Sequence, residues 1–393
     1  MAVESKRAKD IDAYIDSHQN CIKGKQKVVI DGKVNLLESY MIPTSMLLYN
    51  HQNRRFNLEI QEYEIKINRK LDPSDKEDVK TIKELLLQDQ SEAKKLLDDL
   101  KKVGEQTDVG AISFDGVVIN GNRRMATLEE LHETEPTGKW GNLWVVRLPK
   151  DISEKDLWRI EAGLQLSKEK VADYGPVNNL LMINEGKKAG LEPSEIAASM
   201  YGWTEKQVLS DLERLNLINI FLQFMGQPNN YGIIKKFRLH EHFIDIQKGL
   251  IEKQKDQGVS KREISKKLEN VFLYLRAHII SPDINITHYD VRNICKILQD
   301  TEATYSLTDS YENYPDSRKI PIETLMDNFD KASDIKKNRE DKARPSKLIE
   351  RAIAALNSID RKAKHYKTDP DVKIKIKTLY SLVSEIKQEL GIE

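Results

Sequence analysis

A short stretch rich in arginine has the residue types that bind phosphate. GNRRM, residues 121–125, follows a strand-like run, VVIN, and opens a helix-like run. A helix N-terminus leaves backbone N–H groups without intrahelical partners, and arginine offers paired donors that match phosphate oxygens. The stretch therefore predicts an anion site formed by Gly121, Asn122, Arg123 and Arg124. The alternative is that one arginine pairs with an acid such as Glu129 or Asp115 while the other is solvated.

A second cluster of amides and arginines, NHQNRRF (residues 50–56), ends an apolar run. If Asn53 and Arg55 face the same cleft as the 121–125 stretch, side chains suited to an anion converge there. The alternative is a turn with solvent-exposed arginines.

Residues 191–218 have the spacing of a helix-turn-helix. Ala198 is followed four residues later by Gly202 and six after that by Val208, a set that permits close helices and a tight turn. Ser194 and Thr204 are candidate N-caps for the two helices. The second helix offers residue types that contact bases and phosphates, namely Thr204, Lys206, Gln207, Ser210 and Arg214. An ordinary helical hairpin is the alternative, and the nearby acids Glu205, Asp211 and Glu213 oppose a strong non-specific hold on phosphate.

The elements that would position these residues indicate an α+β protein. Asp-Gly pairs at 31–32 and 115–116 predict hairpin turns, and NLWVVRL (142–148) predicts a further strand. Residues 74–104 read as helix, with apolar residues near helical spacing and Gly104 as a stop. Helical patterns dominate after residue 150.

Four regions follow from these patterns. We expect a mixed α/β domain at 1–150 with a helical insertion near 57–104, and a helix-turn-helix segment at 151–225. A helical domain at 226–333 precedes a charged linker and a C-terminal helical hairpin at 334–393. In this last region Ile349, Ile353 and Leu356 form an apolar stripe that either dimerises the chain or packs on its hairpin partner.

Composition narrows the classes of function. Lys+Arg and Asp+Glu are 63 each in 393 residues, so any affinity for nucleic acid must come from local basic surface. No apolar run approaches the roughly 20 residues of a membrane span, and no signal-peptide pattern is evident, so we expect a cytoplasmic protein without membrane contact. The two cysteines, Cys21 and Cys295, predict neither a disulfide framework nor a zinc site.

The order of IPTSMLLYNHQNRRF, VVINGNRRMATLEEL, a strand and a helix-turn-helix resembles the ParB family of partition proteins, across residues 36–225. The resemblance implies a ParB/sulfiredoxin-like N-terminal fold in which Asn53, Arg55 and residues 121–124 hold the triphosphate of CTP, or of another NTP, with Mg²⁺. It also implies a DNA-bound homodimer, associated with nucleoid or plasmid, in partition, mobile-element or phage-defence settings. This chain has Asn122 where the family has Glu, and only Gln165 matches the third nucleotide motif, which falls at 162–166.

Two other functions stay open. A ParB-like nuclease or NTPase would need a metal held by carboxylates, for which Asp31, Asp115, Glu129 and Glu130 are the nearest acids, without diagnostic spacing. A helical protein-interaction scaffold is the third hypothesis. His240 and His242 point to different faces of a helix, so we expect packing or surface roles rather than a shared metal.

Overall fold

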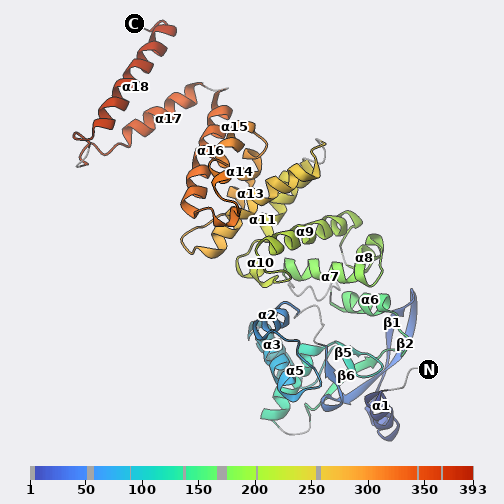
Figure 1. Cartoon of the computed structure of the whole chain (residues 1–393). Coiled ribbons are helices and arrows are strands. Elements are labelled where there is room, and N and C mark those ends of the chain that lie inside the picture. The colour runs from blue at the N-terminus through green and yellow to red at the C-terminus, as the bar shows by residue number, and fades with distance from the viewer. Residues whose placement is uncertain are drawn as a thin grey trace. The chain divides into compact units, whose positions relative to one another are not determined.

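The computed structural model describes residues 5–50, 57–88, 90–135, 139–165, 175–200, 202–253, 258–342, 345–363 and 366–392. The chain forms two compact units, Met1–Cys295 and Lys296–Glu393. The expected α+β class is confirmed, because a mixed six-stranded sheet precedes a long helical region (Figure 1). The finer division into four regions stays a prediction.

The sheet has the strand order β1-β2-β6-β4-β5-β3. Its strands are β1 (Ile22–Ile30), β2 (Lys33–Pro43), β3 (Leu48–Tyr49), β4 (Gly110–Ile112), β5 (Val117–Asn120) and β6 (Asn142–Arg147). β1 and β2 form the predicted hairpin, with Asp31 and Gly32 at φ of 51° and 69°, the left-handed pair that a two-residue turn requires. β4 pairs with β5 antiparallel and with β6 parallel, and β3 pairs with β5 parallel.

Alternation along the central strands sends side chains to two separate cores. Ile112, Val118 and Val145 join one core, while their neighbours Ala111, Ile119 and Val146 join the other. Helices α2 (Asn57–Ile67), α3 (Lys76–Leu87), α4 (Gln90–Val103) and α5 (Asn122–Thr134) contribute to the first core, together with α1 (Lys6–Ser17). α6 (Glu154–Gln165) contributes Leu157 and Ile160 to the second.

The predicted insertion is helical, but residues 74–104 form two helices instead of one. Six apolar residues that recur near helical spacing belong to the first core or pack against it: Ile82, Leu85, Leu86, Leu96, Leu97 and Leu100. α4 ends at Val103, and Gly104 adopts a φ of 84° as the predicted stop. The many charged residues of this segment lie on its outer face, because its apolar face packs against the sheet.

The rest of the first unit is helical. It contains α7 (Pro176–Lys188), α8 (Pro193–Ser199), α9 (Glu205–Phe224), α10 (Gly232–Lys236), α11 (His240–Ile246), a π-helical turn η3 (Gln247–Glu252), α13 (Lys261–Ile280) and the start of α14 (His288–Ile297). A third core joins Trp158 of α6 with Met182, Ile196 and Val208 from α7, α8 and α9. This core packs α7 against α8 and α9, the two helices of the stretch predicted to be a helix-turn-helix.

The second unit contains α15 (Thr301–Leu307), α16 (Ile322–Lys342), α17 (Pro345–Asn357) and α18 (Pro370–Glu389). Asn328 of α16 donates to the carbonyls of Leu307 and Asp309 and so fastens α16 to α15. α16 continues to Lys342, so the start of the expected linker at 334 lies inside a helix. None of the described helices combines the length and apolarity needed to cross a bilayer.

Candidate functional site

The parallel pairing of β3 and β5 brings the starts of the two arginine-containing stretches together. Leu48 pairs with Val117 and Tyr49 with Val118, so the carboxyl ends of both strands lie side by side at the same end of the sheet. Immediately beyond them, the backbone N–H of Asn50 donates to Oδ1 of Asn122 at 2.9 Å. Asn53 and Arg55 themselves lie outside the described residues.

Gly121 and Asn122 shape the turn from β5 into α5. Gly121 is the N-cap residue at φ 114°, a conformation that favours glycine. Asn122 is 2 % exposed, and its Nδ2 donates to the carbonyl of Val118 at 2.8 Å. The oxygen and the nitrogen of this amide thus both make hydrogen bonds to the backbone, so Asn122 is poorly suited to bind a metal or a phosphate.

Both arginines of α5 donate to groups of the protein. Nε of Arg123 donates to the carbonyl of Leu86 at 3.1 Å, in the last turn of α3, where the helix dipole is negative. Arg124 is 15 % exposed and donates to the carbonyl of Asp108 at 2.8 Å and to its carboxylate at 3.3 Å. One arginine therefore pairs with a nearby acid, as the alternative expected, but this acid is Asp108 in place of Glu129 or Asp115.

Two of the acids considered for hydrolysis, Glu129 and Asp115, make hydrogen bonds within the fold. Glu129 accepts a hydrogen bond from the hydroxyl of Tyr49 at 2.6 Å, and burial raises the pKa of this carboxyl. The pKa of Tyr49 is also raised, first by burial and then by the Glu129 charge. Asp115 accepts from the hydroxyl of Ser113 at 2.6 Å. Within the described ranges, no cluster of His, Cys, Asp or Glu is arranged to hold a metal ion.

The stretch predicted to be a helix-turn-helix contains two helices, α8 and α9, joined by a short turn. Gly202 adopts a φ of 79° between them, and Val208 is fully buried against the third core. Thr204 caps α9 in a reciprocal capping box with Gln207. Two details differ from expectation. Glu192 and Glu195 cap α8 in place of Ser194, and Ala197 rather than Ala198 packs at the corner, because Ala198 is exposed.

The candidate DNA-contacting residues divide into two groups. Thr204, Lys206 and Gln207 are exposed at the start of α9. Arg214 is turned inward instead: it donates to Asp211 at 2.6 Å and to Gln247 at 3.1 Å, and its side chain is 12 % exposed.

Ser210 lies on the same inward side of α9 as Arg214. Its backbone carbonyl and hydroxyl both accept from Nε2 of Gln247, which belongs to η3. The expectation that Ser210 and Arg214 are available to DNA is therefore not met in this structure. Sequence reasoning missed the cause, since helical spacing alone does not reveal that a later segment packs against this face.

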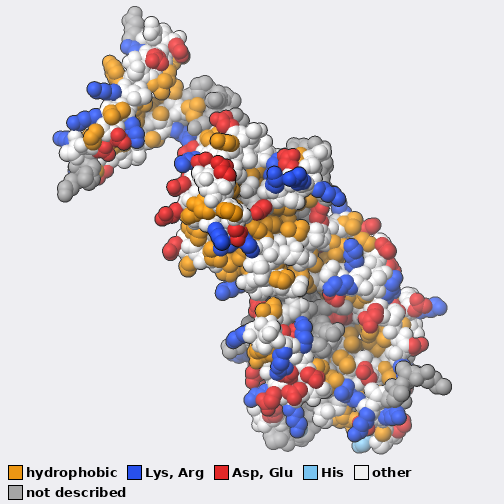
Figure 2. Space-filling view, in the orientation of Figure 1, with side chains coloured by type: hydrophobic (Ala, Val, Ile, Leu, Met, Phe, Trp, Pro, Cys, Tyr) orange, Lys and Arg blue, Asp and Glu red, His pale blue; other side chains and the backbone are white. Residues whose placement is uncertain are grey.

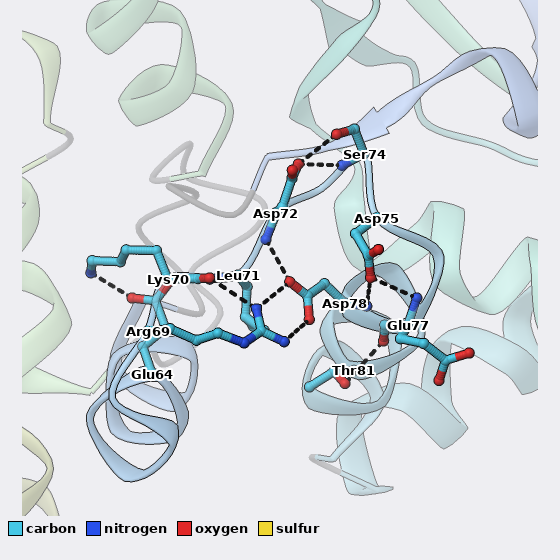
Figure 3. Close-up of polar contacts among 10 residues, drawn as sticks. All are labelled: Glu64, Arg69, Lys70, Leu71, Asp72, Ser74, Asp75, Glu77, Asp78 and Thr81. Carbon is cyan, nitrogen blue, oxygen red and sulfur yellow. Dashed lines mark hydrogen bonds and ion pairs between the residues drawn. The ribbon is translucent and has the colours of Figure 1, made fainter.

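A polar corner between α2 and α3 was not foreseen at all (Figure 3). Both terminal nitrogens of Arg69 donate to the two oxygens of Asp78 at 2.6 Å, and Asp78 also accepts from the N–H of Asp72. These bonds lower the pKa of Asp78 to about 2, with the Arg69 hydrogen bond as the largest cause. Glu64 accepts from the N–H of Leu71 at 3.0 Å. Asp75 caps α3, a signal that the run SDKED does carry.

One wall of a cavity of about 570 Å³ is formed by this corner. Its other wall comes from α7 and from the loop before α10, through residues that include Asn184, Glu185 and Asn229. The charged groups at its rim are paired within the protein: Lys70 with Glu64, and Lys188 with Glu185. The charged residues that line the cavity are three basic ones, Arg69, Lys70 and Lys188, and two acidic ones, Glu64 and Glu185.

The two histidines of RLHEHF pack within the helical region, as expected. His242 is 8 % exposed, and its Nε2 lies 2.8 Å from the carbonyl of Ile286. Burial lowers the pKa of both His240 and His242. The rings of His278 and His288 lie 6.3 and 6.4 Å from that of His242, a grouping that the sequence did not indicate.

The side chain of Gln165, at the end of α6, lies outside what the structure describes. No family model, curated protein or solved structure matches this chain.

Proposed function

We propose that this protein binds DNA through α8 and α9, and that its N-terminal α+β region is a ParB-like domain that binds a nucleotide. The observation that carries the first part is the capped start of α9, where Thr204, Lys206 and Gln207 are exposed beyond a rigid corner. Such a helix start is the part of a helix-turn-helix that contacts base edges. Arg214 has no role in this contact, because it is held by Asp211 and Gln247.

The nucleotide part of the proposal is supported by the adjacent carboxyl ends of β3 and β5. Two arginine-containing stretches begin there, and α5 directs its N-terminus to the same place. A phosphate group bound beside these strand ends would replace the carboxylate of Asp108 as a partner of Arg124, because that contact is long at 3.3 Å. We assign no metal ligand, because the side-chain amide of Asn122 is hydrogen-bonded to the backbone of Asn50 and Val118.

DNA binding is tested by fluorescence anisotropy with duplexes over a range of salt concentrations. Lys206→Ala is expected to weaken binding and to reduce the slope of log K against log salt by about one. Lys66→Ala, which removes an exposed lysine of α2, is the matched control and should leave both unchanged. Equal affinity and slope for Lys206→Ala and wild type would remove α9 as the DNA-contacting helix.

Nucleotide binding is tested by calorimetry with CTP, ATP and GTP, with and without Mg²⁺ and DNA. Arg124→Ala is expected to abolish binding, whereas Asp108→Ala frees the same arginine from its carboxylate partner and should leave affinity equal or higher. Equal loss in both variants would mean that the Arg124–Asp108 contact only maintains the fold. Absence of binding to every NTP by wild type would refute the nucleotide part and leave the DNA part intact. Phosphate release in the same samples reports any turnover.

A further inference from the structure

Three histidine rings meet where α11, α13 and α14 pack together. This histidine cluster consists of His242 of α11, His278 in the last turn of α13 and His288 in the first turn of α14. The ring of His242 lies 6.3 Å from that of His278 and 6.4 Å from that of His288. Asp245 of α11 accepts from His288 at 3.0 Å and from Arg292 at 2.9 Å. These contacts fasten the start of α14 to α11.

Two of these histidines hold the connection between α13 and α14. Nε2 of His242 lies 2.8 Å from the carbonyl oxygen of Ile286, and the N–H of Ile286 donates to Nδ1 of His278 at 3.2 Å. Ile286 is 2 % exposed, so the two rings hold the backbone of a buried residue from both sides. Residues 281–287 form no helix or strand, and the histidines satisfy backbone groups that regular structure would otherwise satisfy.

The surroundings of His242 suit a neutral ring. A carbonyl oxygen only accepts, so the hydrogen of the neutral ring is on Nε2, where it bonds to Ile286. Nδ1 is buried and has no hydrogen-bond partner among the described residues. A second proton would bind at Nδ1, and would leave a buried N–H without an acceptor and a positive charge in the interior. Protonation of His242 therefore opposes the folded arrangement.

The charged and titratable groups around His242 do not offset this cost. Burial is the largest cause that lowers the pKa of His242, and His278 and His288 lower it further. The backbone hydrogen bond and the carboxylate of Asp245 oppose these effects without cancelling them. That carboxylate is also paired with Arg292. A proton on His288 would strengthen its own contact with Asp245, but the side chain of His288 is 31 % exposed, so solvent weakens this opposing effect.

The basic surface of α13 lies away from the cluster. Lys261, Arg262 and Lys266 are exposed near the start of this helix, and Figure 2 shows Lys and Arg side chains at the surface there. His278 is roughly 18 Å further along the helix axis than Lys266, at 1.5 Å per residue. Over such a distance salt screens most of the interaction between exposed charges. The groups that decide the protonation of the cluster are thus those of α11, α13 and α14 that face it.

We propose that the histidine cluster is a pH-sensitive switch, which holds residues 281–287 and the start of α14 on α11 while its rings are neutral and releases them as pH falls. In the released form His242 meets water and takes up its second proton. A proton on Nδ1 of His278 acts in the same direction, because Nδ1 then donates to the Ile284 carbonyl 2.9 Å away and no longer accepts from Ile286. The inference is independent of DNA and nucleotide binding.

Hydrogen–deuterium exchange of the full chain, read by mass spectrometry, tests the switch. The stability that neutral His242 contributes is complete above the ordinary pKa of 6.5 and is lost as pH falls towards the lowered value. Between pH 7.5 and 5.5, peptides covering 281–287 should therefore open up to about tenfold more often, after correction for the intrinsic exchange rate. Peptides covering β6 are the internal reference and should not change. If the two sets of peptides respond equally, the proposal is overturned.

Two substitutions remove the protonation without removing the hydrogen bonds. His242→Gln keeps an N–H for the Ile286 carbonyl, and His278→Asn keeps an oxygen that accepts from the Ile286 N–H, but neither amide titrates. The double variant should lose the pH effect at 281–287, whereas His132→Gln, at an exposed position of α5, should behave as wild type. A pH effect that persists in the double variant refutes the switch. Circular dichroism at pH 7.5 checks the fold, and His242→Gln alone, which should lose most of the effect, serves if the double variant does not fold.

Discussion

Gly186 and Gly163 both lie inside helices, yet alanine should have opposite effects at the two positions. A Cβ at Gly186 of α7 would lie 2.8 and 2.9 Å from ring atoms of Trp158 and 3.2 Å from Ile196. Trp158 cannot move away easily, since it is fully buried and its Nε1 donates to the carbonyl of Met182 at 2.9 Å. Overpacking costs about 1–3 kcal/mol, which outweighs the gain of up to about 1 kcal/mol from replacing a helical glycine. We therefore expect a net loss of about 1–2 kcal/mol for Gly186→Ala.

Gly163→Ala is the matched control, because no atom of the described residues lies within 4 Å of a Cβ at that position in α6. Only the helix-propensity effect remains there, so this variant should gain about 0.5–1 kcal/mol. Urea denaturation followed by tryptophan fluorescence measures both changes, and the melting temperature of Gly186→Ala should fall by roughly 2–8 °C. A Gly186→Ala protein as stable as wild type would refute the packing of Trp158 against α7, and with it the rigid support of α8 and α9.

Three further predictions concern the cap, the polar corner and the buried carboxyl. Thr204→Ala should cost about 1 kcal/mol in urea denaturation, while Thr204→Ser, which keeps the capping oxygen, should resemble wild type. The pKa of Asp78 is lowered to about 2, so its bond to Arg69 stabilises the fold above the ordinary pKa of 3.8 and is lost as pH falls towards 2. Asp78→Asn should therefore lower the melting temperature at pH 7 and have little effect near pH 2; an equal effect at both pH values would contradict this. The raised pKa of Glu129 makes its contribution fall as pH rises from the ordinary value of 4.5. Glu129→Gln can still accept the hydrogen bond from Tyr49. The melting temperature of this variant minus that of wild type should therefore be larger at pH 7.5 than at pH 4. An equal difference at the two pH values would contradict the raised pKa of Glu129.

The sequence by itself determined the features that depend on neighbouring residues. The Asp31–Gly32 turn, the stop at Gly104 and the Thr204 cap were predicted because each follows from backbone sterics or a hydrogen bond within four residues. The spacing of its apolar residues also predicted that the charged insertion is helical.

Only the tertiary structure decided which partners distant in the sequence the arginine side chains take. Arg124 binds Asp108, 16 residues away, and Arg214 binds Gln247, 33 residues away. Arg69 and Asp78 meet because α2 and α3 fold back on each other. Several acids compete for each arginine in a chain that is 32 % charged, and local spacing does not rank them. The choice is made by which groups are buried together, because a charge removed from water must find a partner within hydrogen-bonding distance.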